Sequence, residues 1–149
     1  MKFVAQRVTR AALSVNDTPV SEIGYGLVVY FGVKVGDTEN EARKCMEKLA
    51  NLRIFEDDAG KMNRSVKDVG GEVLLVSQFT LYGDARKGNR PSFTASMEPA
   101  KANEMYERFI SDMREKGLNV QHGEIGADMQ LELLNDGPVT ILLDSTKIL

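Results

Sequence analysis

Residues 71–83, GEVLLVSQFTLYG, form the stretch around which the rest of the chain is organised. It opens with four consecutive apolar residues, 73–76, and then turns polar around Phe79 while keeping the pattern of a strand. A glycine at each end limits the run to the length of a strand rather than that of a long helix. We therefore expect a buried strand whose last residues form the edge of a site.

Side-chain direction constrains any chemistry placed at this edge. Successive residues of a strand point to opposite faces, so Ser77 and Phe79 would share one face while Gln78 and Thr80 share the other. Unless a bulge intervenes, Ser77 and Thr80 cannot both reach one pocket. The simpler interpretation is that the strand only reaches the surface here, where Ser and Thr hydrogen-bond to nearby backbone.

Length and composition favour one ordinary domain. The chain has 149 residues, 42% of them hydrophobic, which is enough to bury a core in a single domain covering residues 1–149. No apolar run reaches the roughly 20 residues that span a bilayer, and no signal-peptide pattern follows Met1, so we expect a cytoplasmic protein without membrane contact. With a net charge of −3, nucleic acid would have to bind through a local basic patch.

The residues that ligate metals or carry redox chemistry are scarce. Cys45 is the single cysteine and His122 the single histidine, which leaves no internal disulfide and no cysteine and histidine cluster for zinc. Cys45 lies on the packing face of a predicted helix, so we expect it to be a small buried apolar side chain and not a nucleophile. Asp57 and Asp58 precede Ala-Gly, which is typical of a solvated turn. The sequence therefore predicts neither a metal nor a cofactor.

Strand patterns dominate the chain and two helical patterns interrupt them. Helical spacing predicts one helix over residues 38–53, opened by a capping box at Thr38, and a second over residues 96–117 with Pro99 in its first turn. Strands are predicted over residues 2–15, 20–23, 27–35, 119–124, 130–134 and 139–144. We expect an α/β fold of the α+β type, with a largely antiparallel, barrel-like sheet and two main helices.

The segment NDGPVT at residues 135–140 combines two turn signals. Asp136-Gly137 between apolar runs is typical of a β-hairpin, so we expect the chain to reverse direction here. Pro138 cannot donate a ladder hydrogen bond at the start of the returning strand. The peptide bond before a proline is also where a cis isomer costs least, although trans is the ordinary state.

Cations cluster directly after the central stretch. Residues 83–93, GDARKGNRPSF, carry Arg86, Lys87 and Arg90 within five residues, together with glycine and one aromatic. Such a loop suits phosphate, although most short basic loops bind nothing. Arg7, on the first predicted strand, would need a partner if it is buried, and otherwise lies on a solvated face.

Two motifs together resemble the D-aminoacyl-tRNA deacylases. SQFTL at residues 77–81 and NDGPVT at residues 135–140 occur in the order of that family, and neither departs from its pattern. The opening strand, the basic loop and the GADM segment at residues 126–129 also follow the family's order, so the resemblance covers the chain. It implies a homodimeric hydrolase, without cofactor, that cuts the ester between a D-amino acid, or glycine as in mischarged glycyl-tRNA(Ala), and the 3′-terminal adenosine of tRNA.

The resemblance also implies roles for particular residues. Gly137 and Pro138, joined by a cis bond, would reach from one subunit into the active site of the other and exclude L-amino acids.

Catalytic candidates are Thr80, the backbone N–H of Phe79, and Ser77. Gln78, Met129 and Arg7 would contact or support the substrate. From their place in the basic loop, and not from the resemblance, we expect Arg86, Lys87 and Arg90 to contact tRNA phosphates. A related animal family keeps a trans Gly-Pro bond and differs in its first motif, so SQFTL argues against it.

Ester hydrolysis needs a nucleophile, a proton acceptor and donors for the developing oxyanion. His122 and Cys45 lie far in sequence from both motifs, so neither a Ser-His-Asp nor a Cys-His arrangement is indicated. Thr80 is one possible nucleophile, but no base lies beside it in sequence. The preferred alternative is a water activated with help from the ribose 2′-OH, with backbone N–H groups near Phe79 holding the carbonyl oxygen.

Other classes of function stay open. A non-catalytic RNA-binding module of the translation apparatus would share the basic loop, but it would not need the GPVT turn. A related deacylase with a different aminoacyl specificity is another alternative. A small-molecule esterase would be expected to show a nucleophile with its base.

Overall fold

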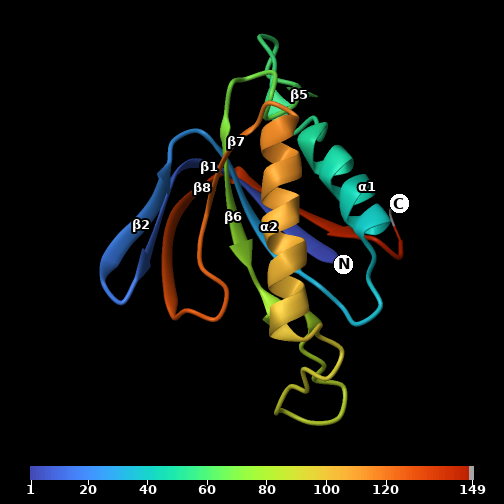
Figure 1. Ribbon diagram of the computed structural model, residues 1–149. Coiled ribbons are helices and arrows are strands. Elements are labelled where there is room, and N and C mark those ends of the chain that lie inside the picture. The colour runs from blue at the N-terminus through green and yellow to red at the C-terminus, as the bar shows by residue number, and fades with distance from the viewer. Residues whose placement is uncertain (148–149) are drawn as a thin grey trace.

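The computed structural model describes residues 1–147 (Figure 1). The elements follow one another as β1 (Lys2–Val15), β2 (Thr18–Ile23), β3 (Gly26–Gly32), α1 (Glu39–Ala50), β4 (Phe55–Glu56), β5 (Met62–Arg64), β6 (Glu72–Ser77), a 3₁₀ turn η1 (Phe79–Tyr82), α2 (Pro99–Glu115), β7 (Asn119–His122) and β8 (Met129–Asp144). Over these residues no helix is long and apolar enough to cross a membrane.

One six-stranded sheet organises the molecule. Its strands are ordered β2-β1-β3-β6-β7, and β8 pairs along the other edge of β1. β1 is antiparallel to β2, β3 and β8, whereas the β3–β6 and β6–β7 pairs are parallel. The predicted fold class, with its barrel-like sheet and two helices, is therefore confirmed. The sheet is more mixed than expected because α1 and α2 lie in the connections that join parallel neighbours.

The sheet packs on both faces. Figure 1 shows α1 and α2 side by side on one face, where Phe31 of β3 stacks on Phe3 and Phe109 with ring centroids 4.8 and 5.0 Å apart. On the opposite face, Val28 is buried and Tyr30 is partly buried in a second apolar cluster that includes residues of β8. β3 is therefore apolar on both faces.

β6 is shorter than the predicted strand. Its ladder with β3 ends where Ser77 pairs with Phe31, and the N–H of Gln78 still donates to the Phe31 carbonyl at 2.8 Å. Because β3 offers no further partner, the chain turns into η1. Gly32 allows this turn to come close, since a Cβ there would lie 3.0 Å from the Gln78 oxygen. The predicted strand is wrong beyond Ser77, and with it the face assignment of Phe79.

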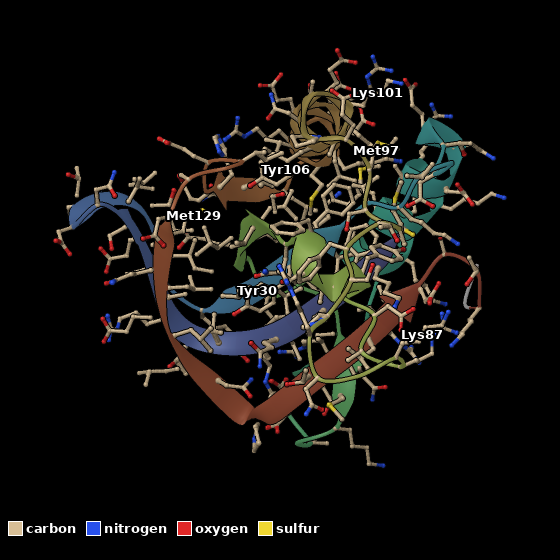
Figure 2. The ribbon with its side chains drawn as sticks, turned by 90° about the horizontal axis from the view of Figure 1, so that it is seen from below. Tyr30, Lys87, Met97, Lys101, Tyr106 and Met129 are labelled. Carbon is tan, nitrogen blue, oxygen red and sulfur yellow. The ribbon has the colours of Figure 1, made fainter. Side chains whose placement is uncertain are left out.

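β8 does not contain the predicted hairpin. It stays antiparallel to β1 on both sides of the NDGPVT segment, with Asn135 opposite Val8 and Thr140 opposite Gln6. The six residues 135–140 thus lie opposite only the three residues 6–8 of β1, and the extra residues of β8 form a bulge. The Gly137–Pro138 bond in this bulge is cis. Figure 2 shows β8 as two arms that meet at a corner.

Both helices are confirmed, with shorter bounds than predicted. Thr38 caps α1, and its capping box with Glu41 is complete. α1 ends at Ala50 rather than at residue 53, and α2 begins at Pro99 rather than at residue 96. Cys45 is buried in α1, and this burial raises the pKa of its thiol to about 12.

Candidate active site

A pocket of about 800 Å³ opens where the parallel strands β3 and β6 end. Its walls come from β3, β6, η1, the segment that leads into α2, and the segment 125–131 that leads into β8. Figure 2 looks onto this end of the molecule, with Tyr30, Met97 and Met129 around the opening. The volume suits a small ligand or the end of a larger one.

Four of the predicted site residues line this pocket: Ser77, Gln78, Phe79 and Met129. The first three are brought together by η1, because the turn breaks the alternation that a strand would impose. The first N–H groups of a helical turn have no acceptor within it, so the backbone donors at the start of η1 are available to a ligand oxygen.

Thr80 does not line the pocket. Its side chain is exposed, and its hydroxyl oxygen accepts a hydrogen bond from Nε2 of Gln78. An amide N–H is a donor and cannot take a proton from the hydroxyl. The arrangement thus leaves Thr80 without a general base.

The pocket also contains residues that were not predicted from the sequence, among them Tyr30, Phe93, Met97, Glu98 and Asp128. Burial raises the pKa of Tyr30, which keeps its phenol neutral. Glu98 and Asp128 are exposed carboxylates that make the rim negative. The parallel pairing of β3 and β6 brings Tyr30 beside the central stretch, and no local pattern reveals that pairing.

Arg7 lies beneath the β8 bulge and does not line the pocket. Its side chain is 5% exposed, and Nη1 donates to the carbonyl of Ile54 at 2.8 Å. Its Nε lies 3.1 Å from Oδ2 of Asp136, close enough for an ion pair but without the alignment of a hydrogen bond. Arg7 is thus buried with a partner, as expected for a buried arginine, and it supports the bulge rather than the pocket.

Asn135 closes the same bulge. Its Nδ2 donates to the carbonyl of Arg7 at 3.0 Å and to that of Val139 at 3.1 Å, so one amide ties together both ends of the bulge and β1. Gly137 has a φ of +120°, and a Cβ there would lie 2.8 Å from the Val139 side chain. Gly137 and Pro138 are exposed, and neither lines the pocket of its own chain.

The basic loop projects beyond the first turn of α2 (Figure 1). Two backbone hydrogen bonds between Asp84 and Ser92, of 2.8 and 2.9 Å, close it. Arg86 is engaged within the loop, since its guanidinium donates to both carboxylate oxygens of Asp84 and lowers the pKa of that carboxyl to about 2. Lys87 and Arg90 are exposed and make no ion pair within residues 1–147.

His122 lies away from the pocket. It is on β7, where Nδ1 is 2.8 Å from the Gly123 carbonyl and the ring meets Tyr106 edge-on. Among residues 1–147, no three His, Cys, Asp or Glu side chains are grouped as they would be to hold a metal ion.

The chain matches known proteins along almost its whole length. A family model described as D-Tyr-tRNA(Tyr) deacylase matches residues 4–144. Two curated relatives named D-aminoacyl-tRNA deacylase, from Desulfitobacterium hafniense strain DCB-2 and Thermotoga petrophila, are each 54% identical over 99% of both chains.

Solved structures agree with these matches. The structure of a protein named c-Myc DNA Unwinding Element Binding Protein superposes with a TM-score of 0.91 at 42% identity and covers 97% of this chain and 98% of its own. A probable eukaryotic D-amino acid tRNA deacylase superposes with a TM-score of 0.80 at 21% identity, covering 95% and 97%, and supports the fold alone. The sequence matches define an enzyme, a hydrolase. The chain belongs to the D-aminoacyl-tRNA deacylase family.

We predict that Arg7→Ala lowers the free energy of unfolding by about 3 kcal/mol, because it breaks a buried ion pair and leaves the Ile54 carbonyl without its donor. Arg10 is the matched control. It lies on the same strand, but the side chains of Arg10 and its partner Glu132 are 45% and 76% exposed. Arg10→Ala should therefore lower the free energy of unfolding by less than about 1 kcal/mol. Urea unfolding at one protein concentration measures both. Equal losses would contradict the role given to Arg7.

Proposed function

We propose that this protein hydrolyses the ester bond of D-aminoacyl-tRNA, releasing the D-amino acid and tRNA, as a proofreading step of translation in the cytoplasm. The observation that carries the proposal is the convergence of Ser77, Gln78 and Phe79 with Met129 at one pocket. The family membership of the whole chain supports the same reaction. Glycyl-tRNA(Ala) is a further substrate under this proposal, because glycine has no side chain to be rejected on either hand.

Main-chain groups supply the chemistry in this proposal. The ester carbonyl accepts hydrogen bonds from backbone N–H groups at Phe79, which stabilise the oxyanion as it forms. The substrate's ribose 2′-OH helps to activate the attacking water. Glu98 and Asp128 make the rim negative and so favour the ammonium group of the aminoacyl moiety. Ser77 stays a catalytic candidate through its place in the wall, and Gln78 and Met129 stay substrate contacts.

Chirality is decided by exclusion. Apolar contacts alone discriminate by about 1–3 kcal/mol, whereas rigid backbone placed where an L side chain must go creates a clash that no rotamer relieves. The bulge that carries Gly137 and Pro138 is held by Arg7 and Asn135, which suits it to this task. Since it does not line the pocket of its own chain, it would act across a homodimer, in the pocket of the partner.

The purified protein should deacylate D-Tyr-tRNA more than about 1,000-fold faster than L-Tyr-tRNA, because rejection by a clash exceeds the roughly 10- to 200-fold that apolar contacts achieve. Release of labelled tyrosine from each charged tRNA measures the two rates, and the free D-tyrosine ethyl ester serves as a control. Equal cleavage of both enantiomers would refute the chirality filter. Rapid cleavage of the free ester would indicate a small-molecule esterase.

Thr80→Ala should retain the deacylation rate within about tenfold, since the hydroxyl has no base and lies outside the pocket. A true nucleophile would cost far more, on the order of a millionfold. Single-turnover hydrolysis of D-Tyr-tRNA measures the rate, and tRNA binding serves as the control for folding. A loss of the larger size with binding intact would make Thr80 the nucleophile.

A mixing experiment tests the cross-subunit arrangement. Ala102→Trp fills the pocket from α2, so its homodimer should be inactive, whereas Gly137→Val disturbs the bulge, so its homodimer should cleave L-Tyr-tRNA as well as D-Tyr-tRNA. In a coexpressed mixture half of the dimers are mixed, and the intact pocket in each of these faces the intact bulge of the Ala102→Trp subunit, so the ratio of L to D cleavage should fall to about half that of the Gly137→Val homodimer. An unchanged ratio, with mixed dimers shown to form, would mean that the bulge acts within its own chain.

A non-catalytic nucleic-acid-binding protein is the second candidate. The 42% identical structure is that of a protein named for binding a DNA element, and the exposed cations Lys87 and Arg90 suit any nucleic acid. The two candidates separate in the deacylation assay, since a pure binding module would cleave neither enantiomer.

A further inference from the structure

Two large aromatic side chains are exposed at the rim of the pocket. Phe79 is 56% exposed and Phe93 is 39% exposed, and their ring centroids lie 5.2 Å apart at an interplanar angle of 69°. An apolar group of this size is usually covered, and a pair that is not covered marks a surface for a ligand. Phe93 belongs to the end of the basic loop and has no role in the chemistry described above.

The ring of Phe93 and the backbone of Phe79 are held in place without a ligand. A Cβ on Gly83 would lie 3.1 Å from Cε1 of Phe93, so the ring packs directly against the backbone of the residue that follows η1. On the other side, Oγ of Ser96 donates to the carbonyl of Phe79 at 3.2 Å. A surface held in this way loses little conformational entropy when it binds.

Charge around these rings is divided by sign. Lys87 and Arg90 lie on the loop that leads into Phe93, outside the pocket, whereas Glu98 and Asp128 lie in its lining. Proteins bind single-stranded nucleic acid with this combination, in which cations follow the phosphates and aromatic faces stack on the bases. The division also sets the direction of the strand, with its phosphates along the loop and its last nucleotide at the pocket.

We propose that Phe93, supported edge-on by Phe79, is a stacking platform for one unpaired base of the single-stranded 3′ end of tRNA. The inference rests on the proposed function for its ligand, but it concerns binding and not cleavage. An unpaired base fits this platform because every base has a flat face, whereas the aminoacyl group varies in side chain. The platform holds the strand so that the ester enters the pocket in one register.

The test uses an uncharged acceptor-stem minihelix ending in ACCA, labelled at its 5′ end, and fluorescence anisotropy over a series of salt concentrations. Phe93→Leu keeps the contact with Gly83 but removes the aromatic face, and it should weaken binding roughly tenfold. Phe93→Tyr should bind as the wild type does. Neither variant should change the slope of log affinity against log salt, because neither changes a charge.

Lys87→Gln is the matched control for charge. Loss of one phosphate contact should reduce the salt slope by about 0.7, the value for a single strand, while the aromatic face is intact. Arg86→Gln should change the slope less, since the Arg86 guanidinium is already engaged with Asp84. Thermal unfolding of each variant shows that its fold is retained.

A double-mutant cycle identifies the base. Minihelices that each lack the base at one position of the ACCA end are bound to the wild type and to Phe93→Leu. At one position, removal of the base should lower the affinity of the wild type but not that of Phe93→Leu. Additive losses at every position, or wild-type affinity in Phe93→Leu, would overturn the platform. Displacement of the labelled minihelix by D-tyrosine ethyl ester from the wild type but not from Phe93→Leu would assign the ring to the aminoacyl group, which also overturns the proposal. If the double-mutant cycle couples Phe93 to one base but the protein does not cleave D-Tyr-tRNA selectively, only the proposed function is refuted.

Discussion

The structure depends on the two-sided pairing of β1. Over its whole length this strand hydrogen-bonds to β8 on one edge, and on the other it pairs first with β3 and then with β2. Backbone groups that are buried must be paired, and a slip of one residue would turn every side chain to the opposite face. The register of β1 therefore fixes both Phe3 in the helix-covered core and Arg7 under the β8 bulge.

The pocket is a consequence of where the central ladder stops. β3 and β6 run parallel and end together, so the chain beyond Ser77 must satisfy its backbone in another way and turns into η1. Because of that turn, Ser77, Gln78 and Phe79 all line the same pocket. The pocket lining includes neither His122 nor Cys45, the side chains most often used as base or nucleophile, which is why the proposed function assigns the chemistry to main-chain groups.

The same constraint separates the bulge from the pocket. β8 remains bonded to β1 on both sides of residues 136–139, so the excess residues are pushed outward, where Gly137 and Pro138 are exposed. Asp136 then meets Arg7, and Asn135 ties the bulge to β1. This segment does not line the pocket of its own chain, which is why a second copy of the chain enters the proposed function.

The sequence alone determined the elements and their chemistry: the full length of β1, the capped start of α1, the apolar central strand and the stretch that lines the pocket. Each depends on local periodicity or local hydrogen bonds. Only the tertiary structure decided that Asp136-Gly137 makes a bulge and not a hairpin, and that Tyr30 and Phe93 join Phe79. These outcomes depend on which strands pair and where their ladders end, and pairing between distant segments leaves no periodic trace in the chain.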